Sequence, residues 1–330
     1  MSFLKNKNIL ITGGTGSFGT KFTEIILKKY NPNKLVVFSR DELKQYQMAK
    51  KFPKKKYPSI RFFLGDVRDR DRLILATKDI DIIIHAAALK QVDQAEYNPF
   101  ECIKTNIIGA ENLIMASLQN KVSKVIALST DKAVNPINLY GSTKLAADKM
   151  FIAANQYSQK NLTKFSVVRY GNVVGSRGSV IPLFKELIKN GSNHFPITDL
   201  QMTRFWITLE DAVSFVISSL KIMGYGEIFI PKMVSMKITD LAKFMDASKK
   251  IKVIGIRAGE KLHEVLISSD ESNNVYHIKD RYIVFPSYYE KSKNWKKVKL
   301  TKVPKNFSYT SNNNRVWLNK KNFNALLKKI

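Results

Sequence analysis

The sequence predicts an α/β fold, a Rossmann-type doubly wound parallel sheet with a smaller C-terminal substrate-binding lobe. Apolar segments of strand length alternate with helical segments in the first half of the chain, which favours a parallel sheet. A glycine-rich turn joins the first apolar segment to the first helical segment. Candidate ligand-binding residues follow the expected strands, at the edge where open parallel sheets bind ligands. They are Gly13, Arg40, Asp66, Ala86, Thr130 and Tyr170.

The expected elements follow one another in a regular order. Strands are expected at 7–12, 34–38, 60–64, 81–85, 124–128 and 165–169. Helices are expected at 20–30, 41–51, 99–118, 139–157 and 210–219. We therefore expect a nucleotide-binding domain over residues 1–173 with a return segment near 206–230. Residues 174–330 would form mainly the substrate-binding lobe and a basic C-terminal tail.

The glycine-rich turn predicts a dinucleotide site. Gly13, Gly16 and Gly19 are spaced three apart between a strand and a helix. In such turns the first glycine permits the tight turn, the second lets the backbone approach a pyrophosphate, and the third lets the helix pack on the strand. The helix N-terminus then offers N–H groups to the phosphates. Thr15, Ser17 and Phe18 of the same turn should also contact the cofactor. The alternative to a dinucleotide site is a generic glycine-rich turn without a bound cofactor.

The end of the second expected strand points to NADP. Sites that prefer NAD usually place a carboxylate there, whereas Ser39 and Arg40 suit a 2′-phosphate, because a guanidinium binds phosphate bidentately. Asp41 and Lys44 are expected at the same end of the cofactor. The alternative is that Arg40 is a solvated residue at the start of the next helix. Further along the chain we expect cofactor contacts from Asp66, Val67, Ala86, Ala87 and Lys90.

Two pairs of proton-transfer groups lie within sixteen residues. Tyr140 and Lys144 are four apart and share one face of a helix, so the lysine cation should favour the phenolate and lower the tyrosine pKa. Asp131 and Lys132 follow Thr130 at the end of an expected buried strand. One pair suits redox chemistry at an alcohol, and both together suit an oxidation followed by an elimination. The alternative for Asp131 and Lys132 is a surface ion pair.

Composition limits the compartment. Of 330 residues 44% are hydrophobic, which is enough for a full core. Cys102 is the single cysteine, so no internal disulfide is possible and a reducing, cytoplasmic location is expected. We find no apolar run of about 18 residues that would predict a membrane span, and the first seven residues are too short and polar for a signal peptide.

The net charge of +28 raises the question of a nucleic-acid partner. We expect none, since the lysines are dispersed and frame no known nucleic-acid motif. Residues 291–330 carry twelve Lys or Arg and no acid, which most simply forms a solvated surface. The four histidines are scattered without metal-ligand spacing, so we expect no metal. His85 ends a buried strand and suits a satisfied core histidine.

Separate motifs carry a family resemblance. The chain resembles the extended short-chain dehydrogenase/reductases in Gly13-x-x-Gly16-x-x-Gly19, Asp66-Val67, His85-Ala-Ala-Ala88 and Tyr140-x-x-x-Lys144. Segments 39–45, 129–133, 135–141, 169–173 and 257–264 look more closely like the inverting UDP-N-acetylglucosamine 4,6-dehydratases of pseudaminic acid biosynthesis. The match spans roughly residues 5 to 290. Ala258 replaces a proline usual in the family, which removes no functional group.

The resemblance implies a mechanism and a UDP-activated amino sugar as substrate. Tyr140 would take the hydroxyl proton at sugar carbon 4 while hydride passes to NADP. Lys132 would remove the proton from carbon 5, and Asp131 would protonate the leaving hydroxyl on carbon 6. Hydride would return to carbon 6, and carbon 5 would be reprotonated from the opposite face. The resemblance also implies a homo-oligomer, a dimer or hexamer.

Further residues are substrate candidates on the same resemblance. They are Lys90, Thr105, Asn172, Val180, Thr198, Arg204, Arg257 and Glu260. Asn172 and the two arginines would suit the pyrophosphate, and Glu260 and Glu264 would suit uridine or ribose hydroxyls. Asn106 is expected to brace the active-site helix.

One physical requirement and several alternatives stay open. Lys132 acts as a base only when neutral; burial, Lys144 and the oxidised nicotinamide should lower its pKa, whereas Asp131 should raise it. A UDP-sugar 4-epimerase would share the fold and the hydride step without needing Asp131 and Lys132. A retaining 4,6-dehydratase and a non-catalytic nucleotide-binding protein are further alternatives.

Overall fold

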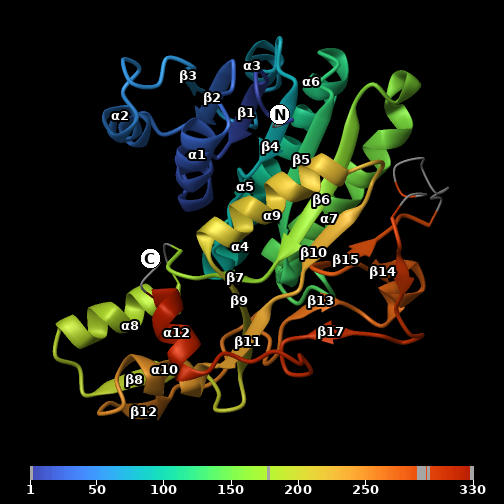
Figure 1. Ribbon diagram of the computed structural model, residues 1–330. Helices are drawn as coiled ribbons and strands as arrows, with labels where there is room; N and C mark the ends of the chain where they lie inside the picture. The colour runs from blue at the N-terminus through green and yellow to red at the C-terminus, as the bar shows by residue number, and fades with distance from the viewer. Residues whose placement is uncertain (1–2, 177–178, 288–294, 296–297, 328–330) are drawn as a thin grey trace.

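The large sheet contains the parallel strands that the sequence predicts (Figure 1). The computed structural model describes residues 3–176, 179–287, 295 and 298–327. The parallel strands are β1 Asn8–Thr12, β2 Lys34–Ser39, β3 Ile60–Leu64, β4 Ile82–His85, β5 Lys124–Thr130, β6 Lys164–Tyr170 and β10 Ile228–Pro231. Their order is β3-β2-β1-β4-β5-β6-β10, and the reversal between β1 and β4 is the switch point at which such sheets bind dinucleotides. The predicted Rossmann-type fold is confirmed.

Helices cover both faces of this sheet (Figure 1). On one face α1 Ser17–Lys29 contacts α9 Leu209–Ile222. On the other, α3 Arg70–Ala76 contacts α6 Gly109–Gln119, which contacts α7 Leu139–Ala153. The remaining helices on this part of the chain are α2 Glu42–Lys51, α4 Val92–Tyr97 and α5 Pro99–Ile103.

The helix expected over 99–118 is interrupted. A π-helical turn, η1 Lys104–Ile108, lies between α5 and α6. Such a turn changes which side chains face inward, and it frequently marks a functional site. Here it buries Thr105 and Asn106, whose side chains would otherwise face other directions on a regular helix.

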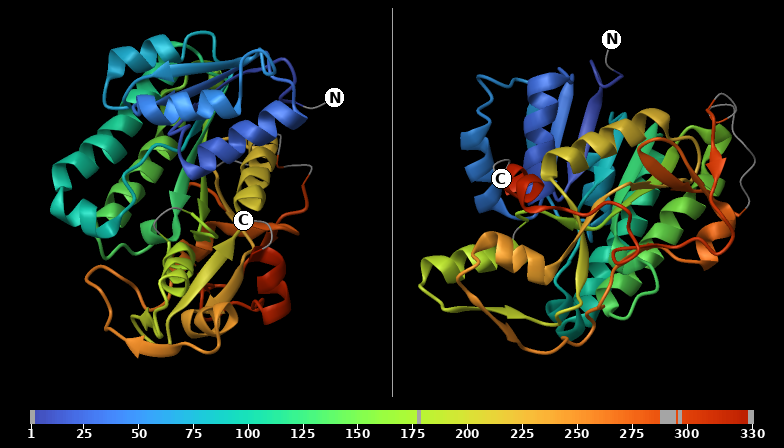
Figure 2. Two further views of the ribbon diagram at one scale, coloured as in Figure 1. Left: turned by 90° about the vertical axis from the view of Figure 1, so that its left-hand side faces the viewer. Right: turned by 60° about the horizontal axis from the view of Figure 1, so that its bottom comes forward.

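A second hydrophobic cluster forms the smaller lobe (Figure 2). Its elements are α8 Val180–Lys189, α10 Ile238–Met245, α12 Lys320–Leu327, the sheet of β7 Asn172–Val173, β9 Thr203–Ile207 and β11 Val234–Lys237, and the pair β8 His194–Ile197 and β12 Lys250–Val253. Phe184, Phe195, Trp206 and Phe323 are buried in this cluster. Because Phe323 lies on α12, the C-terminal helix is part of the lobe's core rather than a solvated tail.

Part of the C-terminal half packs on the large core instead of the lobe. Strands β15 Arg281–Val284, β14 Val275–His277 and β16 Thr301–Lys302 extend the large sheet antiparallel beyond β10. Strand β13 Val265–Ile267 pairs with β17 Tyr309–Thr310, and both contribute residues to the same core. The domain boundary expected near residue 173 stays a prediction. Residues 291–294, 296–297 and 328–330 of the basic tail lie outside the described residues.

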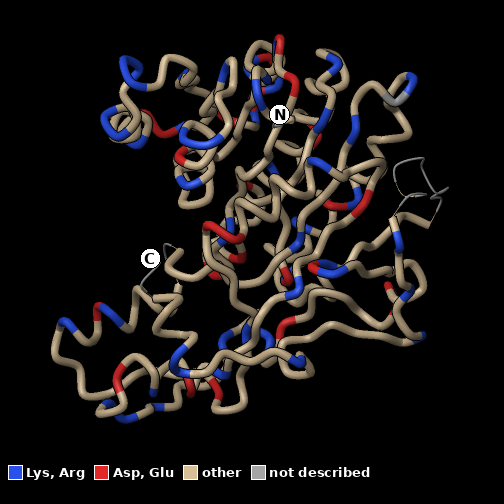
Figure 3. Tube along the Cα trace, viewed as in Figure 1, with Lys and Arg blue, Asp and Glu red and all other residues tan. Residues whose placement is uncertain are grey.

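Lys and Arg lie on many elements throughout the molecule (Figure 3). Within the described residues, no helix combines the length and apolarity of a membrane span. No group of three or more His, Cys, Asp and Glu side chains suited to a metal ion is found in those residues either.

Candidate active site

A cavity of about 1140 Å³ lies at the carboxyl ends of the parallel strands, between the large sheet and the lobe. The structure brings nearly all of the predicted site residues to it. Those lining it are Gly13, Thr15, Gly16, Ser17, Phe18, Gly19, Ser39, Arg40, Asp41, Lys44, Asp66, Val67, Ala86, Ala87, Lys90, Thr105, Thr130, Lys132, Tyr140, Lys144, Asn172, Val180, Thr198, Arg204, Arg257 and Glu260. Asp131 does not line it; this residue lies just behind Lys132.

The glycine-rich turn is shaped to receive a diphosphate. Gly13 has φ +62°, and a Cβ there would lie 2.8 Å from the backbone of Ala86. A Cβ at Gly19 would collide with the Gly14 backbone, so these glycines keep the turn, β4 and α1 in close contact. Helix α1 starts with Gly16 as its N-cap and no side-chain cap. Its first N–H groups are therefore suited to phosphate oxygens, and the turn fits a dinucleotide cofactor.

The end of β2 supplies a second anchoring region. Asp41 is the N-cap of α2 and accepts a hydrogen bond from Lys44 N at 2.9 Å. Thr15 Oγ1 donates to Ser39 Oγ at 3.1 Å. Arg40 lines the cavity with its Nη1 3.7 Å from Asp66 Oδ2. Asp41 thus caps the helix, and the Arg40 guanidinium lies beside the cavity.

Helix α7 places Tyr140 and Lys144 on one buried face, as the four-residue spacing predicts. Burial disfavours the phenolate and raises the pKa of Tyr140 to about 12, although the charge of Lys132 and a hydrogen bond with Thr130 oppose the shift. The expectation that Lys144 lowers the tyrosine pKa is therefore wrong for the protein alone. Lys144 is itself buried, which lowers its pKa, while Asp148 acts in the opposite direction.

Asp148 is a buried residue behind the cavity that raises the pKa of Lys144 and that the sequence reasoning missed. It is buried and accepts a hydrogen bond from Ser129 Oγ at 2.7 Å. Arg169 Nη2 lies 3.8 Å from its Oδ2. Asp148 also follows Lys144 by four residues on α7, a spacing that puts both on one face. That spacing was the signal that would have identified it.

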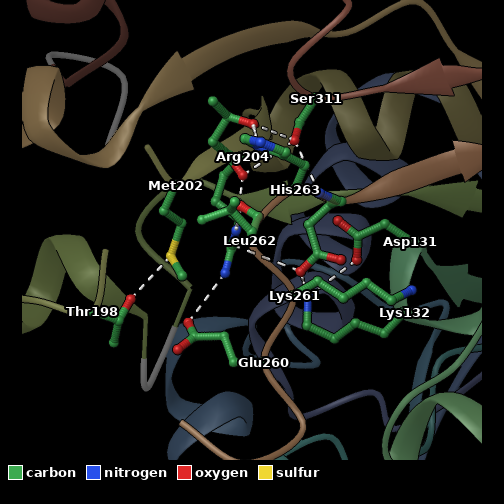
Figure 4. A network of polar contacts seen from close by, with 12 residues as sticks. Asp131, Lys132, Thr198, Met202, Arg204, Glu260, Lys261, Leu262, His263 and Ser311 are labelled. Atoms are coloured by element: carbon green, nitrogen blue, oxygen red, sulfur yellow. Dashed lines mark hydrogen bonds and ion pairs between the residues drawn. The ribbon is translucent and has the colours of Figure 1, made fainter. Parts of the chain in front are cut away.

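The half-buried Lys132 lies against the buried carboxylates of Asp131 and Glu264, and we call these three residues the acid–lysine triad. Figure 4 shows Lys132 beside Asp131. Lys132 Nζ donates to Asp131 Oδ1 at 3.1 Å and to Glu264 Oε1 at 2.8 Å. Thr130 Oγ1 donates to Asp131 Oδ1 at 2.9 Å. The alternative of a surface ion pair is wrong because Asp131 is 1% exposed. Glu264, expected at uridine or ribose hydroxyls, instead contacts Lys132.

Contacts within the triad and burial determine the direction in which the pKa values of Lys132 and Asp131 shift. Burial alone would lower the pKa of Lys132, but the charges of Asp131 and Glu264 outweigh burial and raise it. Burial and Asp131 act on this pKa in the directions expected from the sequence, and Glu264, which was not expected there, adds a second carboxylate that raises it. Burial, and then the charge of Glu264, raise the pKa of Asp131. The pKa of Asp131 and the pKa of Lys132 are thus both shifted toward the protonated form.

Arg204 lies beside the triad and lines the cavity. Its Nη1 donates to the carbonyl oxygens of Thr203 at 2.8 Å and Leu262 at 3.1 Å. Its Nη2 contacts Glu260 Oε1 at 3.1 Å, and its Nε lies 3.7 Å from Glu264 Oε1 (Figure 4). Arg204 thus connects β9 to segment 257–264, which also supplies Arg257 and Lys261 to the cavity.

A family model described as polysaccharide biosynthesis protein matches residues 9–286 of the chain. The chain belongs to this family. A UDP-N-acetylglucosamine 4,6-dehydratase (inverting) from Campylobacter jejuni is 56% identical over 321 residues, which cover 96% of this chain and 95% of the relative. A UDP-glucose 4-epimerase from Rickettsia bellii is 45% identical over 273 residues, which cover 81% of this chain and 79% of the relative.

A solved structure supports the same relationship. The X-ray structure of Pen from Bacillus thuringiensis has a TM-score of 0.88 to the structure of this chain and is 38% identical to it in sequence. The match covers 99% of this chain and 100% of that chain. The resemblance to the inverting dehydratases of the extended short-chain dehydrogenase/reductases is confirmed.

Asn106 braces the site as expected. Its Oδ1 accepts from Leu89 N at 2.8 Å, and its Nδ2 donates to Leu89 O at 2.9 Å and Thr143 Oγ1 at 3.0 Å. It therefore ties the loop after β4 to the helix that carries Tyr140 and Lys144.

Asn106→Ala should destabilise the protein, because it leaves buried backbone groups of Leu89 without their partner. We expect the free energy of unfolding to fall by about 1–3 kcal/mol, measured by urea denaturation. Asn120→Ala removes a half-buried asparagine that bonds Ile74 O and Thr77 Oγ1, away from the cavity. We expect a lower rate of turnover in Asn106→Ala and an unchanged rate in Asn120→Ala. The reverse pattern would contradict the bracing role of Asn106.

Proposed function

We propose that this protein is an NADP-dependent UDP-N-acetylglucosamine 4,6-dehydratase that inverts carbon 5 and yields a UDP-4-keto-6-deoxy-L-arabino-hexosamine. The observation that carries the proposal is the contact of Asp131 with Lys132 beside Tyr140 at one cavity. An acid and a base next to a redox tyrosine match an elimination that follows an oxidation. The inverting dehydratase from Campylobacter jejuni supports the same reaction.

The residues around the cavity fit a dinucleotide with a 2′-phosphate. The glycine turn and the start of α1 would hold the pyrophosphate, and Ser39, Arg40 and Lys44 would hold the 2′-phosphate. Such a cofactor would supply, when bound, an acceptor for hydride from carbon 4 of the sugar and a donor of hydride to carbon 6. Tyr140 and Lys144 line the cavity and would orient the ring and the ribose.

The chain's own residues handle the protons. Tyr140 takes the proton of the hydroxyl at carbon 4, and Lys144 stabilises the phenolate once the site is filled. Because the carbon 4 ketone acidifies the neighbouring hydrogen, the Lys132 amine removes the proton of carbon 5. Asp131, whose pKa burial raises, holds the proton that converts the hydroxyl of carbon 6 into departing water. Asp131 does not line the cavity at rest, so this step requires it to reach the substrate past Lys132.

A UDP-sugar 4-epimerase is the second candidate, and the relative from Rickettsia bellii favours it. That reaction does not require the acid–lysine triad. Incubation with UDP-N-acetylglucosamine without added cofactor separates the two by mass spectrometry. Loss of one water is the expected result, whereas a product of unchanged mass would support the epimerase.

Arg40→Ala should weaken NADP binding by about 10–100-fold, because a hydrogen bond to a charged group contributes about 1.5–3 kcal/mol. NAD lacks the 2′-phosphate, so its affinity serves as the internal control and should change little. Titration of both cofactors by nucleotide fluorescence or calorimetry measures this. An equal loss for NAD and NADP would contradict the assignment of Arg40.

Further properties that we expect of this protein remain predictions. They include a place in pseudaminic acid and surface glycan biosynthesis, a cytoplasmic location, a homo-oligomer and the absence of a nucleic-acid partner. The substrate-side roles of Lys90, Thr105, Asn172, Arg204 and Arg257 are proposals of the same kind.

A further inference from the structure

Glu264 is a buried carboxylate that the proton steps above leave without a role. It is 1% exposed, and its Oε1 contacts Lys132 Nζ at 2.8 Å. Its Oε2 is buried with no hydrogen-bond partner among the described residues. Its backbone is fixed, because Glu264 N donates to Ser311 Oγ at 2.9 Å and Ser311 N donates to Glu264 O at 2.8 Å. The backbone of Glu264 is therefore anchored at the position from which its side chain contacts the amine.

The resting state of Lys132 conflicts with its role as a base. An amine flanked by two carboxylates is an ammonium ion and carries no lone pair with which to remove a proton. Asp131 is a poor acceptor for the excess proton, because it must already be protonated to assist departure of the hydroxyl. Glu260 contacts Arg204 rather than Lys132. Glu264 is the carboxylate in direct contact with the amine that has no other task in the reaction.

We propose that Glu264 accepts the proton of the Lys132 ammonium and so creates the neutral amine that attacks the hydrogen of carbon 5. The inference rests on the proposed dehydratase function. The proton moves from Nζ to Oε1 along the 2.8 Å hydrogen bond, and no bond between heavy atoms changes. Burial of the Glu264 carboxylate favours this exchange, since it converts a buried anion and a half-buried cation into a neutral acid and a neutral amine.

The charge of the triad balances across the elimination. When Asp131 holds the proton that it gives to the departing hydroxyl, Lys132 is positive and Glu264 is negative, so their sum is zero. After the transfer all three are neutral. Lys132 then gains the carbon 5 proton and Asp131 gives its proton to the departing hydroxyl, which again leaves a sum of zero. The triad resets when Lys132 first passes a proton to Asp131, 3.1 Å away, and Glu264 then returns its proton to Lys132. Carbon 5 takes its new proton from solvent.

The charged and titratable groups facing Lys132 define its pH response. They are Asp131, Glu264, Arg204, Lys261 and Tyr140. Arg204 and Lys261 are cations that hold Glu264 ionised at rest; burial alone would raise its pKa, but Lys132 and then Arg204 outweigh burial and lower it. Removing the charge of Glu264 takes away one of the two carboxylates that raise the pKa of Lys132. The Lys132 pKa should then fall, and solvent can remove the proton at alkaline pH.

Glu264→Gln tests the inference because it keeps the size of the side chain and removes its ability to accept a proton. We expect dehydration at neutral pH to slow by about 10²–10⁴-fold, while oxidation at carbon 4 continues and reduced nicotinamide accumulates by absorbance. The variant's rate should rise with pH through the alkaline range, more steeply than that of the unaltered protein. Glu264→Asp should restore part of the rate at neutral pH. Glu111→Gln, an exposed change on α6, is the matched control and should leave rate and pH profile unchanged.

Three outcomes would overturn the inference. One is an unchanged dehydration rate in Glu264→Gln. Another is a slow variant whose rate does not recover with pH, and the third is parallel loss of cofactor binding, carbon 4 oxidation and dehydration, which indicates a structural role. The unaltered protein separates this inference from the proposed function. If the unaltered protein removes no water from UDP-N-acetylglucosamine, the proposed function and the inference both fail. If it removes water and Glu264→Gln does so at the same rate, only the inference fails.

Discussion

Lys132→Ala is expected to lower the rate of dehydration by about 10²–10⁴-fold, the usual contribution of a positioned general base, without weakening NADP binding. The amine is the group that removes the carbon 5 proton, and it contacts both Asp131 and Glu264. Carbon 4 is still oxidised, so reduced nicotinamide should accumulate. Stopped-flow absorbance and product mass spectrometry measure the two steps, and a fluorescence titration measures cofactor affinity.

The folding of this variant needs its own check, because the change leaves two buried carboxylates without their cation. Removing one partner of a buried pair costs about 3–5 kcal/mol, although the carboxylates can take up a proton instead. Lys132→Met retains the aliphatic stem and should show the same kinetic loss with better packing. Lys149→Ala, an exposed change on α7, is the control. Full dehydration activity in either Lys132 variant would rule out the amine as the base.

Tyr140→Phe should abolish the first step, and with it everything that follows. The phenylalanine keeps the ring but cannot take the proton from the hydroxyl of carbon 4, so we expect oxidation and dehydration to fall together by about 10²–10⁴-fold or more. Exchange of the carbon 5 hydrogen with solvent should also cease, because that hydrogen becomes acidic only beside the ketone. Single-turnover absorbance and proton NMR of the sugar follow both events.

Tyr157→Phe changes an exposed tyrosine, 73% accessible, and should be without effect. The pair of active-site variants gives a clear pattern: Lys132→Ala separates oxidation from dehydration, whereas Tyr140→Phe removes both. A Tyr140→Phe protein that oxidises carbon 4 at the normal rate would assign that proton transfer to another group.

Local sequence spacing predicted much of the fold and of the site. The apolar segments fix six parallel strands, since β-branched runs between helices have few other arrangements. The glycine spacing locates the cofactor turn, and the four-residue spacing of Tyr140 and Lys144 puts them on one helical face. Each of these signals comes from residues that are close together in the sequence, so it can be recognised without the folded structure.

The unpredicted features depend on contacts between distant segments. Glu264 reaches Lys132 from 132 positions away, and no local pattern links the two. The raised pKa of Lys132 depends partly on that contact, so the local pattern of Asp131 and Lys144 left its net direction open. The π-turn at 104–108 similarly reflects the tertiary bonds of Asn106 to Leu89 and Thr143 rather than helix propensity.

The configuration of carbon 5 in the product shows directly whether the protein is an inverting dehydratase. UDP-N-acetylglucosamine should be incubated with the protein in deuterium oxide without added cofactor, and the product examined by NMR. We expect a 4-keto-6-deoxy sugar with inverted carbon 5 and deuterium at that carbon. A sugar that keeps its carbon 6 hydroxyl and is inverted at carbon 4, or a ketone with retained carbon 5, would contradict this expectation.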